Sequence, residues 1–287
     1  MELRKLLYVT DIEKPNFSEI EQLLILRKLG LDEILFLCPN RPEDWERRLG
    51  DYGLKSRRLK GEESLLQSIL DAMQKEKISI VAASLRRENR KVLGLSRMRR
   101  LLRSSYIPVI VLHEGAKVSG HMENGIFHHC IIATDWSPVS ETAINYLLNF
   151  REIIEVLEVV YVINKRLSVR DMRSLKQRLI KTRKTFLDRG IDAETHVYAG
   201  KTADEIMLAA KDYGVTSIIM GTSGKSFLKG FFSRSCSYQI AEKAAIPTFF
   251  IPFTGGSKGL NPICAMAQFG RDQGSENISG CKQNKER

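Results

Sequence analysis

The chain has 287 residues, of which 43% are hydrophobic, so it can bury a sizeable core, and its length fits two ordinary domains better than one. Its longest apolar runs, residues 107–112 and 156–163, are far too short to cross a bilayer, which excludes a membrane span. The formal net charge of +11 is unevenly distributed, and two basic stretches carry much of it.

The first residues of the chain and its cysteines indicate a cellular compartment. The first residues lead directly into a strand-like run and lack the apolar region of a secretory signal, so we expect a cytoplasmic protein. The five cysteines, at positions 38, 130, 236, 264 and 281, have no metal-ligand spacing, which indicates reduced thiols rather than structural zinc. His128 and His129 precede an apolar strand, where a solvated pair is a better interpretation than a metal site.

In the first half, four apolar runs predict strands at residues 5–10, 34–38, 78–83 and 107–112. Gly53 interrupts the chain after the second of these runs. Ser64, with Gln67 three positions later, predicts a capping box that opens a helix.

The second half repeats this order, with strands predicted at residues 130–134, 156–163, 193–198, 217–220 and 246–251. Ser137 followed by Pro138 predicts a helix start after the first of them. A long basic helix is expected to end near residue 189, before Gly190. Thr202 with Glu205 predicts another capping box, and a last helix is expected at residues 235–245.

The repeated order predicts two related domains, at residues 1–113 and 128–253, joined by a linker at 114–127. Alternating strands and helices predict right-handed βαβ units. The expected fold class is therefore α/β, with two tandem domains that each hold a five-stranded, mainly parallel open sheet with helices on both faces. Residues 254–287 have hardly any large apolar side chains, so we expect a disordered tail.

Two stretches concentrate the basic residues. Residues 86–103 hold eight basic residues and one acid, Glu88, and residues 165–189 hold ten basic residues against Asp171 and Asp188. Solvated outer helix faces explain such stripes without any partner. The alternative is binding to nucleic acid, an anionic membrane surface or an acidic protein, although no nucleic-acid recognition motif accompanies them.

Short motifs follow one another in a fixed order along the second half. They are Ala133-Thr134-Asp135, Val160-Tyr161-Val162, Gly200-Lys201-Thr202-Ala203 and Met220-Gly221-Thr222-Ser223-Gly224, followed by Ser235 and Ile246-Pro247. In this order they resemble the universal stress protein family in its tandem two-domain form. The resemblance covers about residues 3–113 and 126–253 and is strongest in the second half. The resemblance implies a Rossmann-like fold of the adenine nucleotide alpha hydrolase type. Since family members commonly pair through their last strand, it also implies an intramolecular pseudo-dimer of the two halves, and a homodimer is a further expectation.

Residues 220–240 place glycines, a lysine and hydroxyls after an apolar strand, as phosphate sites do. A P-loop does not fit, because Ile219 stands where that motif needs a glycine. Members of the family that bind ATP carry a spaced glycine motif, which Gly221, Gly224 and Ser235 match. By this resemblance Asp135 would face the ribose, and the backbone N–H groups after Arg234 would meet the phosphates. The implied nucleotide site comprises Ala133, Thr134, Asp135, Val162, Met220, Gly221, Gly224, Arg234, Ser235, Cys236 and Ser237.

Arg234 replaces the third glycine of that motif, and two interpretations stay open. Its side chain can fill the phosphate volume, and a positive φ would add about 1 kcal/mol of strain. Alternatively, its guanidinium can bind a phosphate with about 1.5–3 kcal/mol. In the first half, Ala83 and Arg86 replace both turn glycines, and Asp11 is as well explained as a helix cap. We therefore expect the first half to be a structural partner that binds no ATP.

The sequence assembles no catalytic constellation, since no Ser-His-Asp or Cys-His arrangement is suggested. We expect a non-catalytic regulatory protein of the stress response, with a site for ATP or another adenine nucleotide in the second domain. A scaffold that uses its basic faces is the alternative, and slow ATP hydrolysis is a weaker one. Cys236, near a helix start, could be an acidified thiol, although a buried small residue is the commoner explanation.

Overall fold

The computed structural model describes residues 3–10, 12, 15–38, 44–61, 64–85, 93–113, 125–223 and 234–253. For residues 85, 93–97, 234 and 235 only the backbone is described. Residues Met1–Gly255 form one compact unit. The predicted tail, and residues 114–124 of the predicted linker, lie outside the described residues.

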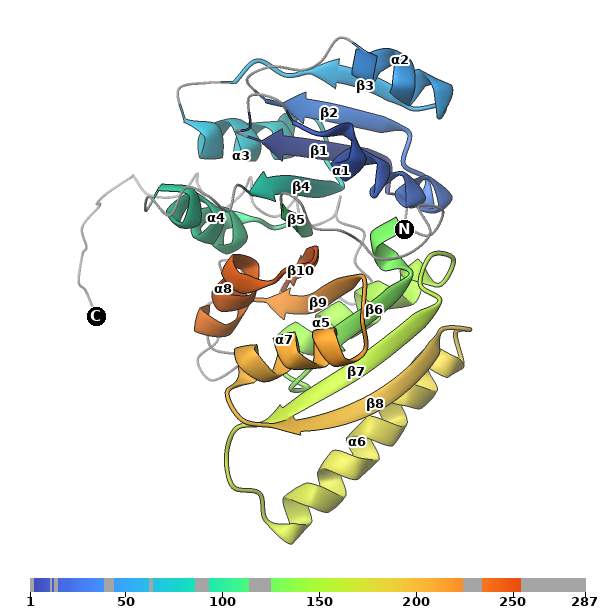
Figure 1. The fold of residues 1–287 in the computed structure, drawn as a ribbon, viewed down its shortest axis with the longest axis vertical. Coiled ribbons are helices and arrows are strands. Elements are labelled where there is room, and N and C mark those ends of the chain that lie inside the picture. The colour runs from blue at the N-terminus through green and yellow to red at the C-terminus, as the bar shows by residue number, and fades with distance from the viewer. Residues whose placement is uncertain are drawn as a thin grey trace, which may run out of the picture. The chain divides into compact units, whose positions relative to one another are not determined.

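In the described ranges, ten strands form a single sheet in the order β3-β2-β1-β4-β5-β10-β9-β6-β7-β8 (Figure 1). The first half supplies β1 (Lys5–Thr10), β2 (Glu33–Leu37), β3 (Lys55–Arg58), β4 (Ile80–Leu85) and β5 (Val109–His113). The second supplies β6 (His129–Ala133), β7 (Val156–Ile163), β8 (Asp192–Ala199), β9 (Ser217–Thr222) and β10 (Thr248–Pro252). Each half is parallel throughout and has the same strand order, which confirms the predicted fold class.

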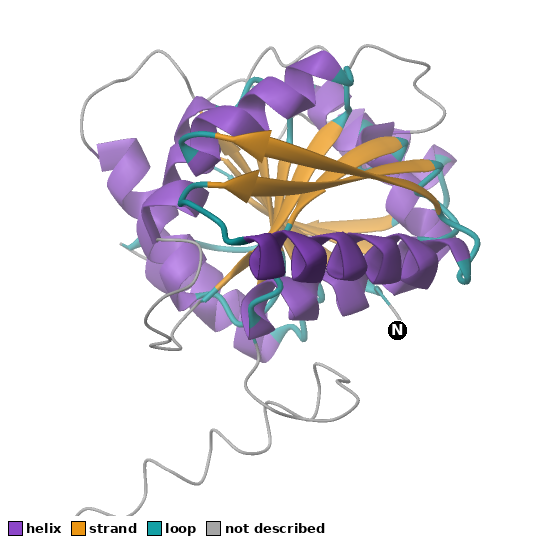
Figure 2. Cartoon of the chain, turned by 90° about the horizontal axis from the view of Figure 1, so that it is seen from below, coloured by secondary structure: helices purple, strands orange, loops and turns teal. Residues whose placement is uncertain are grey.

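Helices cover both faces of the sheet (Figure 2). One face carries α1 (Phe17–Glu21), η1 (Leu24–Leu29), α2 (Asp44–Asp51), α5 (Pro138–Leu147), η3 (Leu148–Phe150) and α6 (Val169–Leu187). The other carries α3 (Leu65–Lys75), α4 (Leu93–Ser104), α7 (Thr202–Asp212) and α8 (Arg234–Lys243). A short turn of 3-10 helix, η2 (Gly125–Phe127), leads into β6. Because both faces are covered, the central strands are buried on both sides, which explains their continuous apolar sequences.

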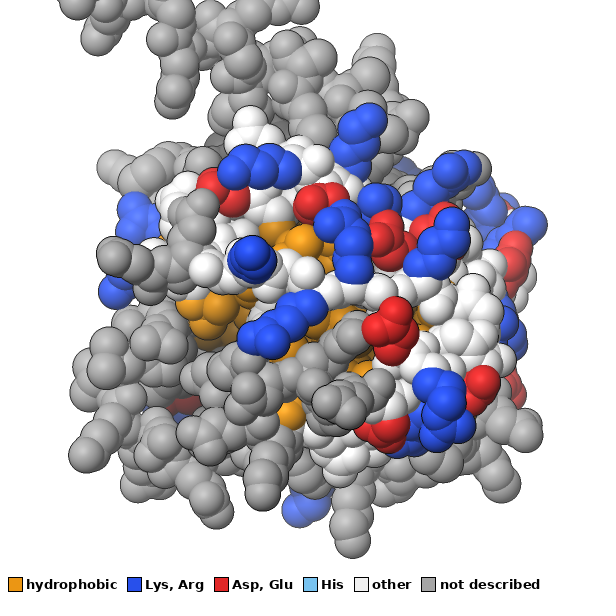
Figure 3. Space-filling view, turned by 90° about the horizontal axis from the view of Figure 1, so that it is seen from above, with side chains coloured by type: hydrophobic (Ala, Val, Ile, Leu, Met, Phe, Trp, Pro, Cys, Tyr) orange, Lys and Arg blue, Asp and Glu red, His pale blue; other side chains and the backbone are white. Residues whose placement is uncertain are grey.

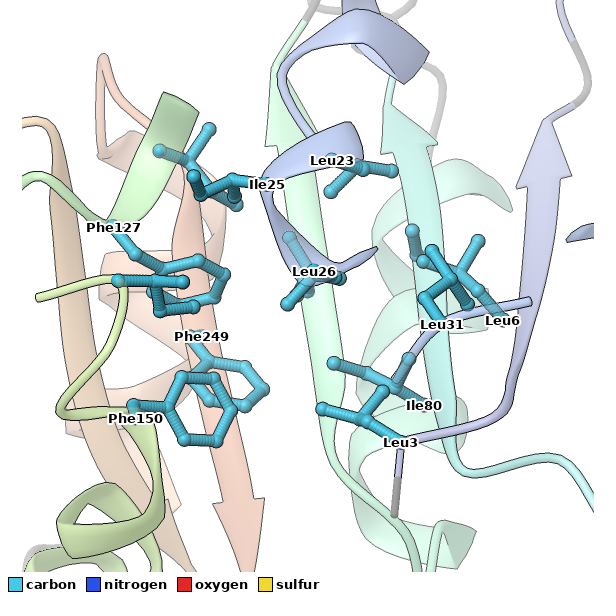
Figure 4. Packing of buried hydrophobic residues seen from close by; sticks show 14 of the residues in the cluster. Leu3, Leu6, Leu23, Ile25, Leu26, Leu31, Ile80, Phe127, Phe150 and Phe249 are labelled. Atoms are coloured by element: carbon cyan, nitrogen blue, oxygen red, sulfur yellow. The ribbon is translucent and has the colours of Figure 1, made fainter. Parts of the chain in front are cut away.

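The two halves join through their last strands. β5 and β10 pair in antiparallel fashion, with Ile110 opposite Phe249, so the two strands meet as predicted. The ring of Phe249 lies 5.4 Å from that of Phe127 and 5.6 Å from that of Phe150, measured between centroids. Ile25 of the first half reaches the same cluster (Figure 4). The core therefore runs through the junction without a break.

The helix starts confirm one sequence prediction and correct another. Ser137 caps α5 by accepting a hydrogen bond from the Ser140 N–H (3.3 Å), with Pro138 in the first turn, as predicted. The predicted capping box of Thr202 and Glu205 is wrong. Thr202 is already the first residue of α7, its cap is Lys201, and that cap has no side-chain hydrogen bond. A helical residue at this position cannot turn its hydroxyl back to the third N–H, so the pattern was misleading by one position.

The β3 end of the sheet has a mixed-charge surface (Figure 3). Arg57 on β3 bonds to Glu33 on β2 (2.9 Å) and to Glu76 at the end of α3. Partial burial raises the pKa of Glu33, but hydrogen bonds from Lys5 and Arg57 outweigh this effect. The pKa of Glu33 therefore lies below its usual value. This end of the sheet therefore balances its basic residues with carboxylates.

Candidate functional site

The carboxyl ends of β6 and β9 meet where the strand order reverses. From β6 the chain passes to β7 on one side, whereas β9 and β10 lie on the other side. Open parallel sheets bind ligands at such a reversal, outside the carboxyl ends of the strands. Ala133 and Met220, both predicted site residues, pair across β6 and β9 at this point. The topology therefore makes this edge the candidate site.

The segment after β6 is held by hydrogen bonds among its own side chains. The hydroxyl of Thr134 is fully buried, accepts from the Trp136 N–H (3.1 Å) and donates to Ser140 Oγ (3.2 Å). Asp135 is half-buried, and its Oδ1 accepts from the Ser137 N–H (3.0 Å) and the Ser140 hydroxyl (2.8 Å). These bonds fix the Asp135 carboxylate at the edge of the sheet, beside the first turn of α5.

Trp136 is a residue that sequence reasoning missed. Its φ is +52°, in the left-handed region that a bulky side chain rarely adopts. The indole N–H donates to Thr182 Oγ1 on α6 (2.9 Å), and the ring lies 5.1 Å from that of Tyr161 on β7. The guanidinium of Arg178 lies 5.8 Å from the ring centroid. Trp136 thus ties the segment after β6 to α6, and these contacts maintain its unusual backbone conformation.

Gly221, the first glycine of the predicted motif, lies at the closest approach of β9 to α5. A Cβ at this position would lie 2.5 Å from the backbone oxygen of Val139 and 2.8 Å from Val139 Cγ1. Carbon and oxygen atoms do not approach this closely in proteins. Glycine is therefore required here by packing alone, whether or not a ligand binds nearby.

The first turns of α8 bring further predicted residues to the same edge. Cys236 and Ser237 are buried, with 4% and 6% of their surfaces exposed. Burial, with a smaller contribution from the nearby charges of Asp135 and Asp204, raises the pKa of Cys236 to about 12. The acidified-thiol interpretation is therefore wrong, because the low dielectric and the carboxylates both favour the protonated thiol.

Three apolar residues of the implied nucleotide site belong to the core. Ala133, Val162 and Met220 lie in the cluster on the α7 and α8 side, and each is at most 6% exposed. Gly224 lies outside the described residues. Arg234 and Ser235 begin α8, where only their backbone is described.

From the sequence, Arg234 could oppose a ligand in two ways, by its side-chain volume and by the strain of a positive φ. The backbone conformation of Arg234 excludes the second. Arg234 is helical, and it is not among the described residues with positive φ. The left-handed strain considered from the sequence therefore does not arise, because helical residues have negative φ. What an arginine changes at this position is the side chain, not the backbone.

The first half repeats the geometry of the loop but not its composition. Thr10 Oγ1 accepts a hydrogen bond from the Ile12 N–H (3.1 Å), as Thr134 does from Trp136. The predicted match of Ala83 to Gly221 is wrong by one position, because Ala83 pairs with Val9 as Met220 pairs with Ala133, so Ser84 occupies the position of Gly221. Asp11 and Arg86 lie outside the described residues.

A second polar cluster, which the sequence did not reveal, lies within the sheet. Glu158 on β7 is 6% exposed, and its two carboxylate oxygens contact His129 Nε2 (2.9 Å) and His196 Nε2 (2.6 Å) on the flanking strands. His196 Nδ1 is hydrogen-bonded to the hydroxyl of Tyr213 (2.8 Å). The sequence contained one signal of this cluster, Glu158 itself, because a glutamate inside an otherwise apolar buried strand requires hydrogen-bond partners.

The described part of the chain contains no group of three histidine, cysteine or acidic side chains arranged to hold a metal ion. His128, which the sequence placed at a solvated strand entry, is paired with Glu155 (3.0 Å). Among the helices of the described residues, none combines the length and apolar character that spanning a bilayer would take.

Comparisons with known proteins agree with this architecture. The model of the universal stress protein family matches residues 127–252. None of the curated proteins compared with the chain matches its sequence. Among solved structures, a universal stress protein from Archaeoglobus fulgidus DSM 4304 shares 19% identity and a TM-score of 0.66, over 88% of this chain and 98% of that one. A putative universal stress protein from Pseudomonas aeruginosa UCBPP-PA14 shares 14% identity and a TM-score of 0.60, over 87% and 93%.

A third structure, of a universal stress protein from Archaeoglobus fulgidus in complex with dAMP, shares 18% identity. It matches 44% of this chain and 98% of its own length with a TM-score of 0.34. The two longer matches span both halves, so they show a shared fold from β1 to β10. Residues 127–252 of this chain therefore form a domain of the universal stress protein family, preceded by a half with the same strand order.

Proposed function

We propose that the chain is a non-catalytic regulatory protein of the stress response that binds an adenine nucleotide at the carboxyl edge of β6 and β9. The observation that supports this most is the convergence of predicted residues at the strand-order reversal. Asp135 follows β6, Gly221 lies near the end of β9, and α8 begins close enough for Asp135 to influence the Cys236 thiol.

The chemistry of this edge suits a nucleotide in two ways. Asp135 offers a half-exposed carboxylate, fixed by Ser137 and Ser140, of the kind that hydrogen-bonds ribose hydroxyls. The first turn of α8 offers backbone N–H groups and the positive end of a helix dipole, which favour phosphate. In this proposal Arg234, at the start of the helix, is a phosphate partner whose guanidinium replaces the close backbone contact of a glycine.

The test is calorimetric titration of ATP and AMP into the wild type and Arg234→Gly. If Arg234 binds phosphate, the change weakens binding about tenfold to a hundredfold, from about 1.5–3 kcal/mol for a charge-assisted bond. If the side chain instead fills the phosphate volume, the same change tightens binding. Arg47→Gly, an arginine in α2 of the first half, is the matched control and leaves the affinity unchanged. Binding by neither protein at millimolar nucleotide would refute the site.

We propose separately that the protein does not hydrolyse the bound nucleotide. No phosphate release above the rate of free ATP is expected from the nucleotide-loaded protein, since the Asp135 carboxylate is engaged by the Ser137 N–H and the Ser140 hydroxyl rather than held to activate a water. Release that Asp135→Asn abolishes would instead support a slow hydrolase.

We also propose that the two halves act as a built-in dimer, with domains at residues 1–113 and 128–253 and without a nucleotide in the first. The antiparallel pairing of β5 with β10 supports this, because it joins equivalent strands. The scaffold alternative rests on a different observation, the outer surface of α6.

A further inference from the structure

The outer side of α6 is an uncovered surface at the β8 end of the sheet. Figure 2 views this end and shows α6 lying across the front, with no other described element over it. The buried residues of the helix are Leu175, Thr182 and Phe186, whereas 13 of its 19 residues are exposed. Most of its circumference therefore faces outward.

Exposed apolar side chains gather on this helix. Of the seven large apolar side chains that are exposed in the described residues, four belong to α6 and a fifth, Val197, to the neighbouring β8. The four are exposed by 39% to 72% and comprise Val169, Met172, Ile180 and Leu187. Single exposed apolar residues need no explanation, but most of those in the described chain lie on this one element and its neighbour.

Basic side chains lie beside these exposed apolar residues of α6. α6 contains seven basic residues and one acid, Asp171, which is engaged in the capping box with Ser168. Five exposed basic residues share this outer side: at about 100° per residue, Arg173, Lys176 and Lys184 lie within about 60° of Val169, and Arg170 and Lys181 lie about 100° and 120° from it. The β3 end of the sheet differs, since Arg57 there is matched by Glu33 and Glu76.

The spacing of the apolar residues shows what shape of partner fits. At about 100° per residue, Val169, Ile180 and Leu187 fall within about 20° of one line, and Met172 lies about 60° to one side of it. That line runs parallel to the helix axis, because Val169 and Leu187 are five turns apart. A coiled-coil partner needs a seven-residue repeat that winds around the axis. A straight line of apolar side chains suits a flat surface instead.

We propose that the outer face of α6, defined by Val169, Met172, Ile180 and Leu187 with the basic residues beside them, docks on an anionic lipid bilayer. The aliphatic side chains enter the headgroup boundary while the long basic side chains reach back to lipid phosphates. A second copy of the chain is a poor occupant, since its own α6 carries the same positive charge. A nucleic acid would match the charge but gives no environment for the aliphatic line.

The experiment is cosedimentation of the full chain with vesicles at low salt. Binding is expected with vesicles of phosphatidylcholine and phosphatidylserine, absent with phosphatidylcholine alone, and weakened by added salt. Lys181→Gln with Lys184→Gln is expected to reduce partitioning roughly 30-fold, from about 1 kcal/mol per basic residue near an anionic surface. Met172→Gln with Ile180→Gln is expected to reduce it about tenfold or more, because each loses part of its apolar burial.

Two matched controls separate this surface from general charge and apolarity. Arg47→Gln with Lys55→Gln removes the same charge from exposed positions in the first half, and Leu208→Gln removes an equally exposed apolar residue from α7. Both controls are expected to bind vesicles like the wild type. Thermal unfolding of the α6 variants beside the wild type checks whether they remain folded.

Three results would overturn the proposal. The first is no binding to anionic vesicles at low salt, and the second is an equal loss in the control variants. The third is tight binding to duplex DNA that Met172→Gln with Ile180→Gln leaves unchanged, which would assign the basic face to nucleic acid. The proposal stands independently of the nucleotide site, whose failure in calorimetry would not affect these measurements.

Discussion

Replacing Gly221 by alanine tests whether this motif glycine is needed for packing. No positive φ accompanies Gly221, so the change adds no backbone strain of its own. The added Cβ would lie 2.5 Å from the Val139 carbonyl oxygen, roughly 0.8–1 Å closer than a normal contact. Since that oxygen is part of the α5 backbone, relief requires the helix to move away from β9. Overpacking of this kind costs about 1–3 kcal/mol.

The assay is urea and thermal unfolding of Gly221→Ala beside the wild type. For a protein of this size, each 1 kcal/mol lowers the Tm by about 2–4 °C, so a fall of roughly 2–12 °C is expected. Adding Val139→Ala should restore only a small part of the loss, because it removes the Cγ1 contact and leaves the carbonyl in place.

Gly50 provides the control for this substitution. It lies in α2 with open space around its Cα, so Gly50→Ala is expected to be neutral or to stabilise by up to about 1 kcal/mol. A Gly221→Ala variant as stable as the wild type would refute the packing explanation and return this glycine to a role in ligand binding alone.

Three further predictions follow from buried groups. Phe249→Ala should lower the free energy of unfolding by about 3–5 kcal/mol. The unfolding midpoints of both halves, each followed by the fluorescence of its own tryptophan, should fall together, and separate midpoints would contradict a shared core. The thiol of Cys236, with its pKa near 12, should react with iodoacetamide at pH 8 more than about a hundredfold more slowly than glutathione, as followed by mass spectrometry. Because the raised pKa favours the protonated thiol of the folded state, its contribution to stability is present below pH 9 and is lost as the pH rises towards 12. Glu158→Gln should lower the free energy of unfolding in urea by about 1–3 kcal/mol, because its buried carboxylate bonds to two histidines. Glu155→Gln, at an exposed position, should change that free energy by less than about 1 kcal/mol, and equal effects would argue against a special role for the buried carboxylate.

The fold was largely predictable because the central strands are buried on both faces. Such strands must be apolar along their whole length, and β1, β6, β9 and β10 are visible in the sequence for that reason. β3 was missed, since its sequence is Lys-Ser-Arg-Arg. Among the described strands it is an edge strand that pairs only with β2, and it is mostly exposed, so burial constrains its side chains little.

The candidate site was predictable to the extent that it depends on strand ends. Residues that follow parallel strands meet at one edge, so Asp135 and Gly221 could be placed near each other from the sequence alone. The contacts of Trp136 with Thr182, and of Glu158 with His196, could not. They join residues 46 and 38 positions apart, and they depend on how α6 and β8 pack rather than on any local pattern.

The comparison of the two halves bears on where function resides. Thr10 and Thr134 each accept a hydrogen bond from the N–H two residues on, so the loop after the first strand is common to both. This shared feature therefore serves the fold. The halves differ at the end of the fourth strand, where the first has Ser84 and the second has Gly221 against α5. Since Gly221 also has a packing role, its presence alone cannot locate a nucleotide, and the side chain of Arg234 becomes the feature whose substitution decides the proposal.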